Sequence, residues 1–111
     1  MAEKRKEKRI NSVLPITVKT PKSTVQCVSM NVSRGGVGFL SEKVIPSGNV
    51  TLQIANASVR GRILYRKEHG PGAIMSASHV YQYGVKLDAT VSQAVLDQWV
   101  FTSRMPSRGQ V

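Results

Sequence analysis

The sequence has one cysteine, few acidic residues and no long apolar run. Cys27 cannot form a disulfide within the chain, and because it lies in an alternating apolar run we expect it to be buried and inert. No apolar run approaches the roughly 20 residues that span a bilayer, so we expect no membrane insertion. The charged N-terminal residues lack the apolar region of a secretory signal. These absences favour a cytoplasmic protein.

The shortage of chemistry-bearing side chains also counts against an enzyme. The six Asp and Glu residues are scattered singly, and no nucleophile stands near a base in a recognisable pattern. His69 and His79 have no cysteine or carboxylate neighbours at metal-ligand spacing, so we expect no metal and no cofactor. A binding role is therefore favoured over catalysis.

Basic residues are abundant by contrast. Sixteen Lys and Arg residues give the 111-residue chain a formal net charge of +10, which predicts attraction to nucleotides, polyanions or anionic lipid. The charges gather in residues 4–9 and again in residues 60–67. Aromatic residues make up only 5%, which argues against the stacking platform of an RNA- or DNA-binding barrel.

Alternating apolar residues predict six short strands. They cover about residues 12–19, 24–32, 37–40, 50–54, 59–66 and 81–87, with turn residues between most of them. In the second strand we expect Val25, Cys27 and Ser29 on one face and Val32 on the other. In the fifth we expect Tyr65 to point inward. Residues 68–79 resemble a long mobile loop.

The last element is predicted to be a helix. Thr90 to Gln93 fit a capping box with Thr90 as the N-cap, and Val91, Val95, Leu96 and Trp99 fall on one helical face. Strands followed by one helix predict a mainly β protein, a small antiparallel six-stranded β-barrel with a C-terminal helix as a lid. We divide the chain into a flexible basic arm (1–11), the barrel with its helix (12–103) and a flexible tail (104–111).

Two short segments are candidates for ligand binding. The segment Asn31–Gly36 combines hydrogen-bonding side chains, Arg34, Gly35 and Gly36 in a tight corner between two strands, where backbone amides can approach a ligand. Taken alone, this segment is better explained by an ordinary hairpin, with glycine supplying positive φ. Upstream, Arg5 and Arg9 stand four residues apart, and their planar guanidinium groups suit phosphates and purine faces.

In this order, the R-x-x-x-R arm, the N-x-S-x-x-G corner, the strands and the closing helix resemble the PilZ domain family. The matching residues are Arg5, Arg9, Asn31, Ser33 and Gly36, with further similarity in residues 35–39, 60–65 and 83–87. The resemblance covers roughly residues 4–101 and indicates a stand-alone, single-domain bacterial member. It implies binding of the second messenger cyclic di-GMP, and hence signalling to an unidentified downstream protein.

The resemblance also implies a role for each matching residue. Arg5 and Arg9 would clamp guanine and phosphate, Asn31 and Ser33 would hydrogen-bond the ligand, and Gly36 would admit the backbone closely. Arg34 and Gly35, at unspecified positions of the corner, are added as further ligand contacts. Many members have another arginine before R-x-x-x-R, where this chain has Lys4, so one ligand and an intercalated pair both remain open. The alternative function is a ligand-independent adaptor in pilus or motility machinery.

Overall fold

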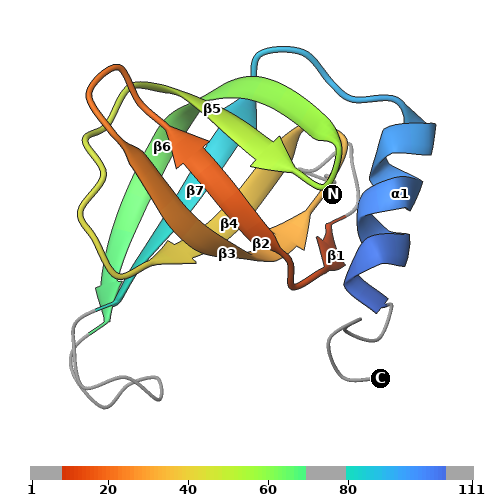
Figure 1. Cartoon of the computed structure of the whole chain (residues 1–111), viewed down its shortest axis with the longest axis horizontal. Coiled ribbons are helices and arrows are strands. Elements are labelled where there is room, and N and C mark those ends of the chain that lie inside the picture. The colour runs from red at the N-terminus through yellow and green to blue at the C-terminus, as the bar shows by residue number, and fades with distance from the viewer. Residues whose placement is uncertain (1–8, 70–79, 105–111) are drawn as a thin grey trace, which may run out of the picture.

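The computed structural model describes residues 9–69 and 80–104, which form one β-barrel and one helix (Figure 1). The elements in chain order are β1 (Ile10–Asn11), β2 (Pro15–Lys19), β3 (Thr24–Val32), β4 (Gly36–Ser41), β5 (Asn49–Ile54), β6 (Ala57–His69), β7 (Val80–Leu87) and α1 (Gln93–Arg104).

The barrel closes because β3 pairs on both sides. The strand order is β3-β2-β5-β6-β7-β4, β4 then returns to β3, and every pairing is antiparallel. The short β1 also pairs with β3, with Ile10 opposite Val32 and Asn11 opposite Asn31. Closure gives each of the six barrel strands a partner on both sides. The predicted six-stranded antiparallel barrel with a C-terminal helix is confirmed.

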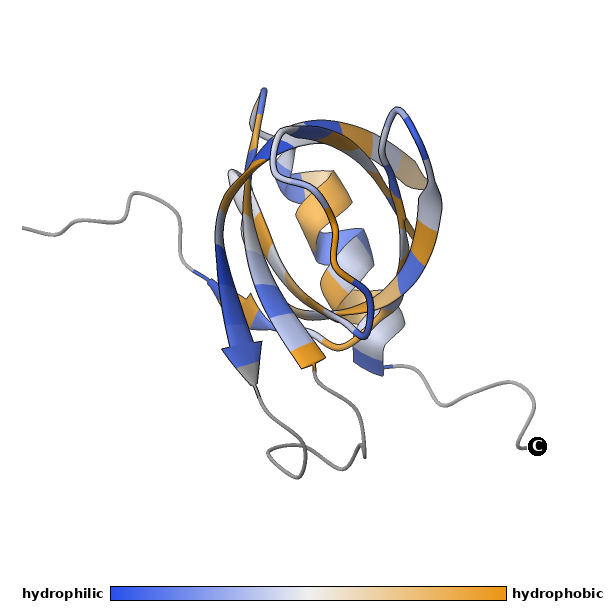
Figure 2. Ribbon diagram, turned by 90° about the vertical axis from the view of Figure 1, so that its left-hand side faces the viewer, coloured by the Kyte–Doolittle hydropathy of each residue, from blue (hydrophilic) through white to orange (hydrophobic). Residues whose placement is uncertain are grey.

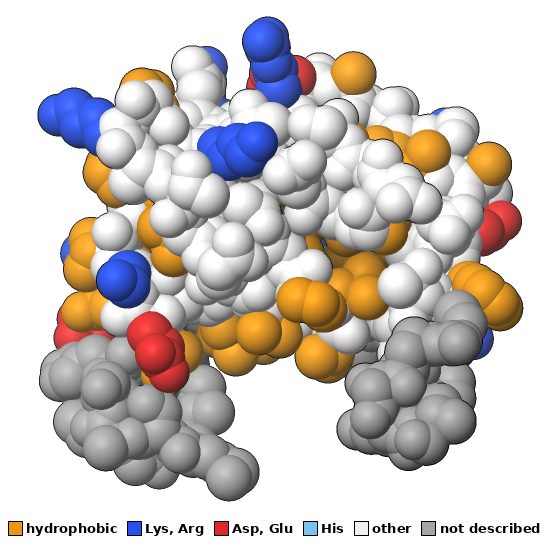
Figure 3. All heavy atoms as spheres, viewed as in Figure 1, with side chains coloured by type: hydrophobic (Ala, Val, Ile, Leu, Met, Phe, Trp, Pro, Cys, Tyr) orange, Lys and Arg blue, Asp and Glu red, His pale blue; other side chains and the backbone are white. Residues whose placement is uncertain are grey.

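Apolar side chains from all six barrel strands fill the interior. Ile16, Val18, Phe39, Leu52 and Ile54 are at most 1% exposed. The helix α1 lies across one end of the barrel, as the view along the barrel shows (Figure 2). Trp99 of α1 is fully buried and Leu96 nearly so, which confirms the predicted lid. On the outside, Lys and Arg side chains stand apart from one another on the face that Figure 3 shows.

A β-bulge at Met30 changes which face β3 presents to the core. Ser29 pairs with Phe39 but Asn31 pairs with Gly38, so Met30 is an extra residue on β3. One inserted residue inverts the alternation that follows it. Val32 is therefore fully buried, like Val25, and the predicted placement of Val32 on the opposite face is wrong. The same inversion turns Asn31 outward.

A second bulge, at Leu64, likewise inverts which side chains of β6 face the core. Ile63 pairs with Val85 and Tyr65 with Gly84, and Tyr65 is 42% exposed. The prediction that Tyr65 points inward is wrong for this reason. The strand β6 also runs on through Glu68 and His69, which pair with Tyr81 and Val80. Of the predicted 68–79 loop, only residues 70–79 lie outside the described residues.

The helix begins later than the capping box predicts. Its N-cap is Ser92, whose Oγ accepts a hydrogen bond from the Val95 backbone N–H at 3.2 Å. The Ser92 carbonyl also accepts from the Leu96 N–H at 3.1 Å. The predicted cap at Thr90 is wrong because the backbone N–H and carbonyl of Val91 are both hydrogen-bonded to Arg34, so the first helical turn begins after Val91.

Candidate functional site

The corner between β3 and β4 is a tight hairpin. Ser33 N–H donates to the Gly36 carbonyl at 2.9 Å, so Arg34 and Gly35 alone form the tip. The Ser33 side chain is 5% exposed and stabilises this tip from within. Its Oγ accepts from the Gly35 N–H at 3.2 Å and donates to the Gly36 carbonyl at 3.4 Å. Ser33 therefore serves the shape of the corner in this structure.

Gly36 packs closely against the neighbouring strand β7. A Cβ at Gly36 would lie 3.0 Å from the Val85 carbonyl oxygen, tighter than most real Cβ contacts. The Gly35 carbonyl accepts from the Leu87 N–H at 2.9 Å and so ties the tip to β7. Positive φ, expected here for an ordinary hairpin, occurs instead at Gly48 and Ala55 among the described residues.

Arg34 connects the corner to the segment that leads into α1. Its Nε donates to the Val91 carbonyl at 2.9 Å, and the Val91 N–H donates to the Arg34 carbonyl at 2.8 Å. One nitrogen of the Arg34 guanidinium, Nε, is therefore used to hold the corner to the segment before α1. Its terminal nitrogens, Nη1 and Nη2, have no hydrogen bond within the described part of the chain.

Asn31 and Arg9 face outward and contact each other. The Nη1 of Arg9 donates to the Oδ1 of Asn31 at 3.2 Å, although 22 residues separate them in sequence. The pairing of β1 with β3 brings the two together, because Asn11 lies opposite Asn31. Asn31 also lies over Gly38, where an added Cβ would be 3.0 Å from its Oδ1. Arg5 lies outside the described residues.

Two exposed side chains lie beside the corner although the sequence did not place them there. Lys86 lies opposite Gly36, and Arg62 lies opposite Lys86 on the other side. The alternation of residues 81–87 predicts that Lys86 faces outward. The alternation does not predict which strand lies next to Lys86, because β4 and β7 pair although some forty residues separate them in the sequence.

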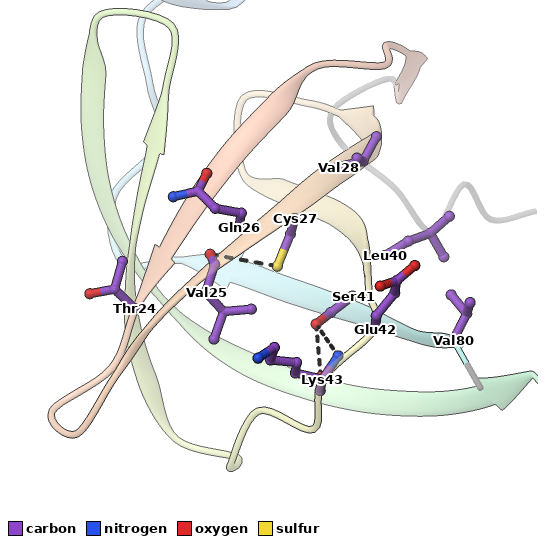
Figure 4. Close-up of a pocket in the computed structure, with 10 residues that line it drawn as sticks. All are labelled: Thr24, Val25, Gln26, Cys27, Val28, Leu40, Ser41, Glu42, Lys43 and Val80. Atoms are coloured by element: carbon purple, nitrogen blue, oxygen red, sulfur yellow. Dashed lines mark hydrogen bonds between the residues drawn. The ribbon is translucent and has the colours of Figure 1, made fainter. Parts of the chain in front are cut away.

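A separate hollow lies away from the corner, where β3 and β4 diverge beyond the pair of Val28 and Leu40 (Figure 4). Its volume is about 650 Å³, and Cys27, Ser41 and Lys43 are among its lining residues. Burial raises the pKa of the Cys27 thiol to about 11, while a hydrogen bond with Ser41 opposes the shift. The thiol is therefore protonated at neutral pH and a poor nucleophile.

Other site types find little support. Within residues 9–69 and 80–104 no three His, Cys, Asp or Glu side chains gather in a way that could hold a metal ion. The one described helix is too short and too polar to cross a membrane.

The closed barrel, its end lid and its glycine-rich corner define a small antiparallel-barrel domain. The chain belongs to the PilZ domain family, whose family model matches residues 3–102. PilZ domains are binding and adaptor domains. No match is found among proteins of curated function.

Solved structures of the same fold include two bacterial proteins. One is the PilZ domain with c-di-GMP of YcgR from Escherichia coli, at 17% identity and a TM-score of 0.64, covering 91% of this chain and 92% of that one. The other is the Inhibitor of motility (MotI/DgrA) of Bacillus subtilis, at 13% identity and a TM-score of 0.58. That match covers 92% of this chain and 50% of the other.

Proposed function

We propose that this protein is a receptor for cyclic di-GMP, bound between the arm and the barrel surface at Asn31. In this proposal Arg5 and Arg9 clamp guanine and phosphate, and the Asn31 amide hydrogen-bonds the ligand from the barrel. The observation that carries it is the 3.2 Å hydrogen bond from Arg9 Nη1 to Asn31 Oδ1, which joins the two sequence segments on the outer surface. The similarity to a YcgR domain with c-di-GMP supports the choice of ligand.

The remaining corner residues would support the ligand indirectly. Ser33 and Gly36 fix the hairpin, Gly35 joins it to β7, and Arg34 joins it to the start of α1. A dianion held by forked guanidinium groups is also consistent with the +10 net charge. We further propose that ligand binding holds the arm that precedes β1 against the barrel and so creates a surface for a protein partner. Similarity to an inhibitor of motility makes motility machinery a candidate for that partner.

The first prediction concerns Arg9. Titration calorimetry of the full chain with cyclic di-GMP should give micromolar or tighter binding. Arg9→Ala should weaken it at least tenfold, because a charge-assisted hydrogen bond contributes about 1.5–3 kcal/mol. Arg9 is exposed, so the variant should melt at the wild-type temperature.

Lys22→Ala is the matched control. Lys22 is an exposed cation in the turn before β3, and the length of β3 separates it from Asn31. It should bind the ligand like the wild type. No binding by the wild type would refute the proposal and favour the ligand-independent adaptor. Equal losses in both variants would reduce the role of Arg9 to net charge alone.

A further inference from the structure

Lys86 and Arg62 form a pair of cations beside the corner. Lys86 of β7 lies between Gly36 of β4 and Arg62 of β6, in a row across three neighbouring strands. The strands β4, β7 and β6 lie side by side in the barrel wall (Figure 1). Both side chains are exposed. Neighbouring strands are about 4.8 Å apart, and like charges directly opposite each other destabilise a sheet. Such a pair is therefore suited to a bound anion that neutralises both.

Among the described residues, no acidic side chain neutralises this pair. Neither Lys86 nor Arg62 forms an ion pair within the described residues. The nearest acidic residue along β7 is Asp88, whose backbone N–H donates to the Arg60 carbonyl at 2.9 Å. Its carboxylate makes no ion pair with either cation. On β4, the residue opposite Lys86 is Gly36, which has no side chain. An anion can therefore approach Lys86 from the direction of β3 and Asn31.

The next row on the same outer face contains an aromatic ring. Asn31, Gly38, Gly84 and Tyr65 lie opposite one another on β3, β4, β7 and β6. The Asn31 amide lies over Gly38, and the Tyr65 ring occupies the space where a Cβ of Gly84 would be. Because β4 and β7 are neighbours, the amide and the ring stand about one strand spacing apart. Tyr65 remains 42% exposed on this outer face of the barrel.

These two rows are complementary to a nucleotide. A purine stacked on the Tyr65 ring would present its edge to the Asn31 amide, since Tyr65 and Asn31 lie in the same row on the outer face of the barrel. Outward positions two residues apart on a strand are separated by about 6.7 Å, which places the Lys86–Arg62 row at the distance of an attached phosphate. Aromatic stacking and paired cations are common means of holding a base and its phosphate.

We propose that Tyr65, Lys86 and Arg62 form a base-and-phosphate subsite of the ligand site, continuous with Asn31. This inference rests on the proposed cyclic di-GMP function and names the barrel residues that extend it. Tyr65 stacks on the guanine whose edge Asn31 reads. Lys86 and Arg62 share one phosphate of the same ligand.

Titration of the full-length chain with cyclic di-GMP tests each part. Lys86→Gln and Arg62→Gln should each raise Kd about 5- to 20-fold and reduce the dependence of Kd on salt. Tyr65→Leu should raise Kd roughly tenfold, whereas Tyr65→Phe keeps the ring and should change Kd less than about threefold. Gly84→Ala should act like Tyr65→Leu, because the added methyl group displaces the ring without changing its chemistry.

Arg60→Gln is the matched control for the cations. Arg60 is exposed on the same strand two residues before Arg62, but it lies opposite Thr51, away from Lys86. It should bind with the wild-type Kd. If the wild type binds and Arg9→Ala is weakened while the Tyr65, Lys86 and Arg62 variants bind normally, the subsite is refuted and the receptor proposal survives. If the wild type does not bind, both are refuted.

Discussion

At the level of single residues, Ser33 and Asn31 have opposite surroundings although they stand two positions apart. Ser33 is 5% exposed, and within the described residues its side chain bonds to the corner alone. Asn31 reaches the surface and accepts a hydrogen bond from Arg9. A sequence pattern contains both residues and does not distinguish a residue that shapes a site from one that touches a ligand. Burial makes that distinction here, because a side chain enclosed by its own hairpin has little surface left for a ligand.

Replacing Ser33 should therefore lower stability. Ser33→Ala removes the acceptor of the Gly35 N–H in a partly buried position, and an unsatisfied donor there costs about 1–2 kcal/mol of unfolding free energy. Urea denaturation followed by circular dichroism would measure the loss. Cyclic di-GMP affinity should fall much less than in Arg9→Ala.

The matched control is Ser58→Ala. Ser58 is exposed near the hairpin end of the β5–β6 pairing, opposite Gln53. The unfolding free energy of this variant should stay within about 0.5 kcal/mol of wild type. If Ser33→Ala keeps full stability and loses the ligand, Ser33 is a ligand contact and its enclosed position in this structure is not the binding-competent one.

At the level of secondary structure, strand positions could be predicted because each strand buries one face. Val18, Leu52 and Val85 show this alternation, which reflects burial against a common core. The bulges at Met30 and Leu64 could not be predicted in the same way. A bulge is a mismatch in length between two paired strands, and the residues of one strand do not record the register of its partner.

The start of α1 gives a prediction that distinguishes Ser92 from Thr90 as the N-cap of the helix. Ser92→Ala removes the side-chain acceptor of the Val95 N–H and should cost about 1 kcal/mol, or about 4–8 °C in melting temperature for a domain of this size. Thr90→Ala, which alters the cap expected from the sequence, should leave the melting temperature nearly unchanged. A larger loss in Thr90→Ala would contradict the assignment of Ser92 as the N-cap.

At the level of the whole molecule, barrel closure assembles the candidate site. Arg9 lies just before β1, Asn31 on β3, Tyr65 on β6 and Lys86 on β7. The strand order β3-β4-β7-β6 makes them neighbours. The sequence predicted the Arg9 and Asn31 part through two short motifs. It could not predict the Tyr65 and Lys86 part, because that depends on register between strands far apart in sequence.

A site shared by strands from the whole barrel should stabilise the whole barrel when it is occupied. At a ligand concentration 100 times Kd, binding to the folded state alone adds about 2.7 kcal/mol to the free energy of unfolding. For a domain of roughly 100 residues this corresponds to a rise in melting temperature on the order of 10 °C, measurable by scanning calorimetry.

Two variants serve as controls. At the same ligand concentration, Arg9→Ala should show only part of the rise in melting temperature, and Lys22→Ala should show all of it. A shift of equal size with GMP at matched concentration would contradict recognition of the cyclic dinucleotide, because a single nucleotide cannot engage both the arm and the Tyr65–Lys86–Arg62 subsite.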